Sequence, residues 1–312
     1  MNGVRRRFLI ALVGVLASSI FVFAMLRVLP GDIATARLGT DATPAALDEL
    51  RRDYGLDRSI PRQYSEWMLD AMRGDLGRSL VDGDDVGSAI IARLDVTIPL
   101  VLTSSLISVV AAVWIGRRTA LHRRRLSSVL VGSLSQLGLA IPTFVLGIAI
   151  VSLFAVRWQL LPAGGFPVDG WGKPVDAFRS MLLPVVTLSL TQVSMLVRFA
   201  RSQSLDYVAS DAFRTARAVG RTAEHAMSPA LRLVLSPVLT VTALQVSTLL
   251  TGAVVVESVF ALPGLGSMLV RDIANRDVTK VQSTILVIII AVFVIRLIVD
   301  FLNDRLDPRR LS

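Results

Sequence analysis

The chain has 312 residues, of which 53% are apolar and only 18% are charged, with a formal net charge of +9 and a mean hydropathy of +0.63. Soluble domains usually carry nearer a quarter charged residues, so the composition excludes an ordinary soluble protein and predicts several membrane spans. The chain has no cysteine and only two histidines, which excludes disulfides, thiolate metal sites and an all-histidine metal site.

Six charge-poor apolar segments are long enough to cross a membrane, since a helix needs roughly 20 apolar residues to cross about 30 Å of hydrocarbon. They are Phe8–Leu26, Val96–Gly116, Leu126–Val156, Met181–Val197, Leu233–Val256 and Val281–Leu302. Pro142 interrupts the third. Arg296 and Asp300 in the sixth can pair on one helix face, as a structural pair or, less favoured, as part of a proton relay. The sequence predicts an all-α membrane protein with about six transmembrane helices.

The amino terminus also has features of a signal peptide, because Arg5, Arg6 and Arg7 precede an apolar stretch. That stretch is longer than the apolar part of a typical signal peptide, and no small-residue cleavage site ends it before Arg27. An uncleaved first span is favoured.

The basic residues orient the spans, because short cytoplasmic segments of membrane proteins carry an excess of arginine and lysine. With the amino terminus inside, the inside segments hold 17 basic and five acidic residues. The first outside segment, residues 29–96, holds 8 basic and 13 acidic residues. Both termini are therefore predicted to be cytoplasmic, and the topology explains the net positive charge without a nucleic-acid partner.

Residues 29–95 are too long for a simple connector and are predicted to fold outside the membrane. Thr43 is a good N-cap residue, with Pro44 at the first helical position, and Gly55 can end that helix in a left-handed turn. A second helix is predicted over Pro61–Arg73, with Gly74 as its stop. The segment is either a cap on the membrane surface or a docking surface for an extracellular partner, and its acidic character favours the partner.

Residues 199–235, between the fourth and fifth spans, combine an apolar and a basic helix face. The apolar face comprises Leu205, Val208, Ala209, Ala212, Phe213 and Ala216, and the other comprises Asp206, Ser210, Arg214, Arg217 and Arg221. Gly220 breaks the helix, and Ser228 with Pro229 offers a cap and a first-turn proline for another. Such a helix-turn-helix is either a lever that transmits movement from a soluble partner or an interfacial helix whose arginines contact anionic lipid.

Short motifs follow one another in order along nearly the whole chain. They are LPGD at 29–32, DYGLD at 53–57, QY at 63–64, GDLGRS at 74–79, SDAFRTARAVG at 210–220, ESVFALPGLG at 257–266, Asp277 and LDPR at 306–309. This set resembles the dipeptide, oligopeptide and nickel branch of binding-protein-dependent ABC importer permeases. The 210–220 motif is similar to the family's coupling loop, with Thr215 at its acidic position.

The resemblance implies the architecture of a type I ABC importer permease and the roles of several residues. It places Asp211, Arg214, Thr215, Ala216, Arg217 and Gly220 in the loop that docks on the ATPase, and Pro30, Gly31 and Asp32 in an external motif. Glu257, Pro263 and Gly264 follow the fifth span as an outer gate or a structural turn. Glu257 can meet the amino terminus of a peptide, or be solvated or structural, and the last two roles are favoured.

The resemblance also implies partners and a substrate. A second, homologous permease subunit would complete the translocation path, two ATPase subunits or one fused ATPase would bind ATP and magnesium, and an extracellular binding protein would deliver a dipeptide or oligopeptide. This chain would hold no cofactor or metal and would not be an enzyme. A nickel chelate or haem is the alternative substrate in the same transporter class.

The residues also exclude some chemistry and leave two other classes of function open. The chain has no G-x-x-x-x-G-K-[ST] phosphate-binding loop and no H-E-x-x-H metal motif. A gradient-driven carrier would need carboxylates deep in several spans, and only Asp300 and Glu257 come close. A third hypothesis is a membrane receptor or assembly scaffold that transports nothing, and only the folded outside segment supports it.

The predicted domain organisation has three parts. Residues 1–28 form the cytoplasmic amino terminus and first span, and residues 29–95 form the extracellular helical segment. Residues 96–312 form the permease domain in the bacterial inner membrane, with the coupling loop at 199–235.

Overall fold

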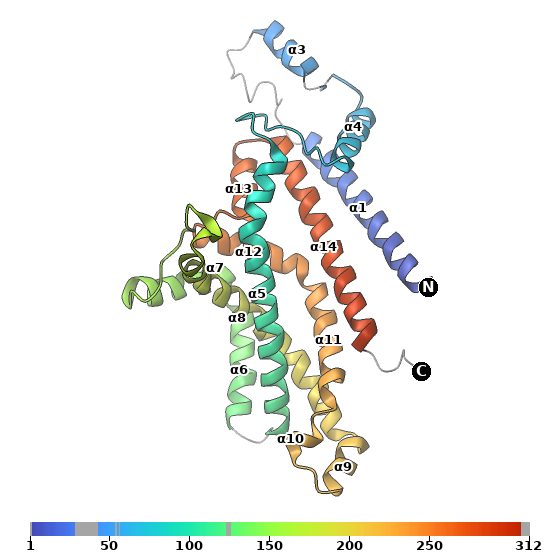
Figure 1. Ribbon diagram of the computed structural model, residues 1–312, viewed down its shortest axis with the longest axis vertical. Coiled ribbons are helices and arrows are strands. Elements are labelled where there is room, and N and C mark those ends of the chain that lie inside the picture. The colour runs from blue at the N-terminus through green and yellow to red at the C-terminus, as the bar shows by residue number, and fades with distance from the viewer. Residues whose placement is uncertain (1, 29–42, 54, 56, 123–125, 307–312) are drawn as a thin grey trace. The chain divides into compact units, whose positions relative to one another are not determined.

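A computed structural model describes residues 2–28, 43–53, 55, 57–122 and 126–306. Within these ranges the chain is helical, and the only strand-like feature is a bridge between Arg78 and Asp85 (Figure 1). The predicted all-α fold is confirmed. The motif Pro30, Gly31 and Asp32 and the carboxy-terminal residues 307–309 lie outside the described residues.

Four helices are long and apolar enough to span a membrane. They are α1 (Asn2–Val28), α5 (Val86–Leu121), α8 (Pro174–Ala209) and α14 (Val278–Leu306). They overlap the predicted first, second, fourth and sixth spans but extend beyond them, because polar residues at a helix end do not stop the helix. Asp85, for example, begins α5 by accepting a hydrogen bond from the Ser88 amide at 2.7 Å.

The predicted third and fifth spans are bent helix pairs. The helix α6 (Leu126–Ala140) is followed, after the break at Pro142, by α7 (Thr143–Ile150) and a π-helical turn (Val151–Arg157), with a bend of 106°. The helices α11 (Ala230–Leu244) and α12 (Val246–Val259) meet at Gln245 with a bend of 63°. Proline explains the first bend because it cannot donate to the helix ladder. The second bend was not predicted. Counting each pair as one span gives up to six spans, in agreement with the predicted number.

The chain forms two compact units. Unit 1 contains Met1–Val96 and Ser267–Val294, and unit 2 contains Thr97–Gly266 and Ile295–Ser312. The predicted organisation into residues 1–28, 29–95 and 96–312 describes topology across a membrane and stays a prediction. It did not anticipate that residues 267–294 pack with the amino-terminal part of the chain.

In unit 1, α1 packs against α14, and α4 (Ile60–Met72) packs against the end of α1. A Cβ at Gly14 would lie 2.3 Å from the Phe293 ring, so only glycine permits this approach. The Phe23 ring contacts those of Tyr64 and Trp67, with centroids 5.4 and 5.8 Å apart. Tyr64 and Trp67 of α4 therefore lie on its contact surface with α1.

The local signals predicted for the two helices of unit 1 after α1 are confirmed. The Thr43 hydroxyl accepts the Ala46 amide at 3.4 Å at the start of α3 (Pro44–Asp53). Gly55 and Gly74 both adopt a positive φ, of 61° and 89°, as the left-handed stops require. The first predicted helix boundary is correct, and α4 begins one residue earlier than predicted.

In unit 2, α5, α8 and α11 surround a buried apolar core. Its fully buried members are Ala112, Leu196, Ala200, Met227, Ala230, Val234 and Val238. Gly116 lets the backbones of α5 and α8 approach closely, since a Cβ there would lie 2.8 Å from the Ala200 carbonyl carbon. Small residues at such crossings are typical of helix packing in membranes. This core positions the 199–235 segment described next.

Candidate functional site

The 199–235 segment comprises the end of α8, two short helices and the start of α11, and the two short helices lie at one end of unit 2 (Figure 1). The helix α8 runs out of its span to Ala209, and Ser210 then starts the short helix α9 (Asp211–Ala218). The Ser210 hydroxyl accepts the Phe213 amide at 3.4 Å. Ser210 is therefore a cap, and the single continuous helix expected from the spacing of the apolar residues is wrong. A serine side chain competes for backbone hydrogen bonds and so favours a helix boundary over a helix interior.

The helix α9 ends at Gly220 in a Schellman turn. The Gly220 amide donates to the Arg217 carbonyl at 3.1 Å and the Arg221 amide donates to the Ala216 carbonyl at 3.2 Å. Gly220 has a φ of 87°, and nothing lies within 4 Å of the position of a Cβ. The predicted break at Gly220 is confirmed, and its requirement for glycine comes from the backbone alone.

The base of this segment is anchored to the core of unit 2. After Gly220, Thr222 caps the four-residue helix α10 (Ala223–Ala226), whose last residue accepts the Tyr207 hydroxyl at 3.2 Å. The next carbonyl, that of Met227, accepts Arg117 Nη2 at 3.2 Å. The Met227 side chain is fully buried. The predicted cap at Ser228 is wrong, because Pro229 is itself the N-cap residue of α11.

The outer face of α9 is exposed and basic. Arg214 pairs with Asp211 at 2.5 Å, but the two side chains are 72% and 91% exposed, so the pair adds little stability. Arg217 donates to the Arg221 carbonyl at 2.6 Å, and Thr215 is exposed. Only Phe213 and Ala216 turn inward as half-buried residues, and the Phe213 ring meets that of Tyr207. The helix α9 is therefore polar and exposed, and the residues beside it are anchored to the core of unit 2 through Tyr207 and Arg117.

Glu257 lies in a second site of unit 2, where α12 ends in a turn at Pro263. Its side chain is fully buried and accepts the Thr97 hydroxyl at 2.6 Å, and that hydroxyl in turn accepts the Leu265 amide at 2.8 Å. A Cβ at Gly264 would lie 2.1 Å from the Glu257 carboxyl carbon. The solvated role is therefore wrong, and Glu257 joins Thr97 of α5 to the turn around Pro263 and Gly264.

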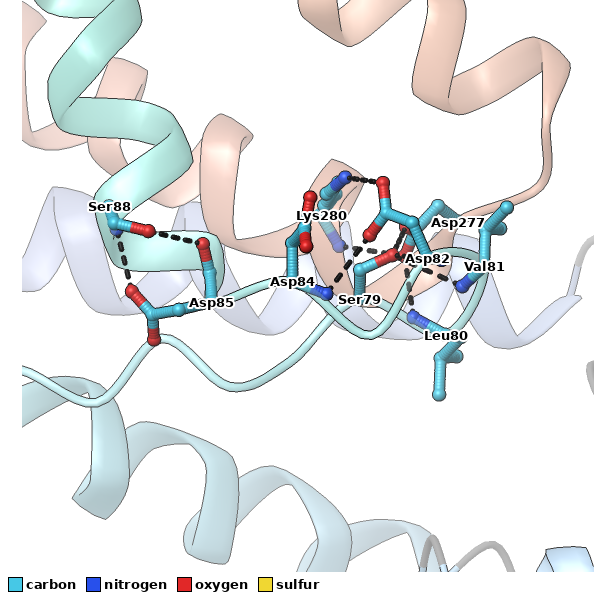
Figure 2. A network of polar contacts seen from close by, with 9 residues as sticks. All are labelled: Ser79, Leu80, Val81, Asp82, Asp84, Asp85, Ser88, Asp277 and Lys280. Carbon is cyan, nitrogen blue, oxygen red and sulfur yellow. Dashed lines mark hydrogen bonds and ion pairs between the residues drawn. The ribbon is translucent and has the colours of Figure 1, made fainter.

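A polar network in unit 1 holds the segment before α5 to the start of α14 (Figure 2). The buried Ser79 hydroxyl donates to Asp277 at 2.5 Å and accepts the Val81 and Asp82 amides, each at 3.1 Å. Lys280 donates to Asp82 at 2.5 Å. The hydrogen bond from Lys280, followed by the proximity of the Ser79 hydroxyl, lowers the pKa of Asp82 to about 2. We call Ser79, Asp82, Asp277 and Lys280 the polar latch.

The predicted intramembrane pair does not form in this structure. Arg296 is exposed and Asp300 is half-buried on α14, and the residues described there include no ion pair between them. A spacing of four residues permits a pair but does not impose the rotamers that it needs.

The sequence reasoning missed the anchoring contacts of Tyr207 and Arg117 and the polar latch. The latch joins residues 198 positions apart, and the sequence singled out Asp277 only as part of the family resemblance, without a partner. Gln192 and Gln245, polar residues of the predicted fourth and fifth spans, both line one cavity of unit 2.

Comparisons with known proteins agree with this membrane architecture. Residues 104–312 match the family described as the inner membrane component of binding-protein-dependent transport systems, and residues 1–101 match its N-terminal membrane component. A putative peptide transport system permease protein of Brucella suis is 37% identical over 292 residues, covering 93% of each chain. A probable peptide ABC transporter permease protein of Sinorhizobium fredii is 32% identical, covering 97% of each.

A glutathione transport system permease protein of Pectobacterium atrosepticum is 33% identical over 290 residues, covering 93% of this chain and 92% of its own. The matches span both units and include the 199–235 segment and the residues of the polar latch. The chain therefore belongs to the inner membrane components of binding-protein-dependent transport systems, and it is a multi-pass ABC importer permease.

Proposed function

We propose that this chain forms half of the translocation path of an ATP-driven importer of peptides, with a second homologous permease subunit forming the other half. Two ATPase subunits or one fused ATPase bind ATP and magnesium and dock on the 199–235 segment from the cytoplasm. An extracellular binding protein delivers the peptide. Both termini lie in the cytoplasm, and residues 29–95 face the binding protein.

The observation that carries this proposal is the placement of α9. Its polar face is exposed, while Tyr207, Met227 and Arg117 hold its base to the core formed by α5, α8 and α11. A push on α9 would therefore reach the spans directly, because packed helices transmit displacement as rigid bodies. A helix lying on anionic lipid would instead need an apolar face turned outward, and the half-buried Phe213 faces the base.

Peptide as substrate follows from the relatives. Two of the three similar permeases above carry a name for peptide transport, and the third is named for glutathione, a small peptide. A nickel chelate or haem remains the alternative within the same class. The binding protein that is paired with this permease would decide between them, through the ligand that it retains on purification.

Reconstitution of the whole transporter into liposomes tests the coupling role. Gly220→Asp adds a charged side chain at the exposed tip of the docking segment, and we expect ATP-dependent peptide uptake to fall at least about tenfold, a loss of roughly 1.4 kcal/mol of coupling. Deletion of Arg214–Gly220 should abolish uptake. An apparent Tm of the purified variant equal to that of the wild type shows that the variant is folded.

Gly74→Asp is the matched control. Gly74 ends α4 in the same Schellman geometry, with a φ of 89° and nothing within 4 Å of a Cβ position. The two substitutions therefore carry the same backbone strain, on the order of 1 kcal/mol. Wild-type uptake by folded Gly220→Asp would contradict the coupling assignment. Uptake that survives ATP depletion but stops with an uncoupler would instead favour a gradient-driven carrier.

A further inference from the structure

A partly open cavity of about 150 Å³ lies in unit 2, between two helix breaks. Leu139 and Thr143, which flank the break between α6 and α7, line one side. Gln245 and Thr248, at the break between α11 and α12, line another. The unbroken α8 contributes Gln192. Irregular backbone at membrane depth is tolerated where it lines an internal cavity, and broken helices often form the substrate sites of transporters.

The cavity presents amide groups that the chain leaves unpaired. Gln192 is only 7% exposed, and among the described residues neither its amide nitrogen nor its amide oxygen has a hydrogen-bond partner. The buried Gln245 oxygen also has none, while the Gln245 nitrogen donates to the Met195 sulfur. A buried amide without partners is unfavourable, so these groups oppose folding unless a ligand pairs with them.

The lining selects the chemistry of such a ligand. The described residues around the cavity include no charged side chain; they are aliphatic side chains, threonines, a methionine and the two glutamines. The Thr191 hydroxyl already donates to the Leu188 carbonyl at 2.8 Å, whereas the buried glutamine amides leave one nitrogen donor and two oxygen acceptors unpaired. A primary amide offers both, which is the complement of the N–H and C=O of a peptide bond.

The size of the cavity sets how much of a peptide fits. A cavity of this volume holds a group the size of benzene, which corresponds to one peptide bond with a small or medium side chain. We propose that this cavity is a transport subsite that binds one peptide bond through Gln192 and Gln245, without selecting for charge. The proposal rests on the proposed function, because it needs a peptide in the translocation path.

The test uses the complete transporter in liposomes, with a mixture of tripeptides and the same mixture N-methylated at the central amide. Uptake of each is followed by mass spectrometry. Gln192→Leu should raise the KM for the unmodified tripeptides about tenfold and make the preference over the methylated ones weaker than that of the wild type. Gln245→Leu should do the same to a smaller extent. Any preference exerted by the binding protein is common to all variants and cancels in the comparison.

Gln282→Leu is the matched control, because Gln282 is also buried, at 5% exposed, but belongs to unit 1. It should leave the KM and the preference unchanged. An unchanged preference in Gln192→Leu would overturn the subsite, as would an equal loss in Gln282→Leu. Wild-type transporter that takes up neither mixture would refute peptide transport itself, whereas wild-type uptake with an unaffected Gln192→Leu would refute the subsite alone.

Discussion

Gly264 lies against the buried carboxylate of Glu257, so a single added methyl group tests how tightly the turn after α12 is built. In Gly264→Ala the new Cβ would lie 2.1 Å from the Glu257 carboxyl carbon and 2.2 and 2.4 Å from its two oxygens. Real Cβ atoms do not approach other atoms so closely. The carboxylate must therefore move, and its 2.6 Å hydrogen bond from Thr97 is lost.

The expected cost has two parts. Overpacking a buried site typically costs about 1–3 kcal/mol. Loss of the hydrogen bond leaves a buried polar group unsatisfied and costs about 1–3 kcal/mol, and the Thr97 hydroxyl also loses the position in which it accepts the Leu265 amide. Together we expect the free energy of unfolding to fall by roughly 2–6 kcal/mol. At about 2–4 °C per kcal/mol for a chain of this size, the apparent Tm should fall by roughly 4 °C or more.

The assay is thermal unfolding of the purified protein in detergent, followed by intrinsic fluorescence. Combining Gly264→Ala with Glu257→Ala removes the clash, so the glycine substitution should cost much less in that background. Gly147→Ala is the control, since its Cβ would meet Val259 at 3.3 Å, and alanine is favoured in a helix interior. An apparent Tm of Gly264→Ala within about 2 °C of wild type would refute the reasoning, as would an equal penalty in both backgrounds.

Three further predictions concern the latch and the cavity. Ser79→Ala leaves Asp277 and two amides without the hydroxyl, so the free energy of unfolding should fall by about 2–4 kcal/mol, against less than about 0.5 kcal/mol for Ser88→Ala at the exposed start of α5. Because the pKa of Asp82 is lowered, its pair with Lys280 stabilises the fold above about pH 4, and this stabilisation is lost as the pH falls towards 2. Asp82→Asn should therefore lose about 1 kcal/mol less free energy of unfolding over this pH range than the wild type, after allowance for the exposure of Asp82. Gln192→Leu should raise the apparent Tm by a few degrees, because it removes a buried amide without partners, and a lower Tm would contradict that reading of the site.

The signals confirmed by the structure are local ones. Apolar length predicted the spans, Thr43 predicted a cap, and Gly55, Gly74 and Gly220 predicted left-handed helix ends. Each of these depends on residues within a few positions of one another, so the sequence contains the whole cause. The predictions for Ser210 and Ser228 were wrong, although they also depended on local signals, because each residue fits two alternative positions in a helix. Ser210 could sit on a polar helix face or cap the next helix.

The contacts between distant positions could not be read from spacing. Glu257 appeared to be at a solvated end of a span, but the fold buries it beside Thr97, 160 positions earlier. Arg296 and Asp300 had the spacing of a pair, but a pair also requires both side chains to give up rotamer freedom. The polar latch shows the same limit, because no local pattern links Ser79 to Asp277.

The sequence by itself determined the membrane class, the approximate number of spans and the position of the 199–235 segment, because hydropathy and charge act along the chain without reference to its fold. Tertiary structure alone decided which polar groups are buried and whether they are paired. Gln192 illustrates the division: its place in a span is a property of the sequence. Its unpaired amide depends on how two broken helices and α8 pack around the cavity.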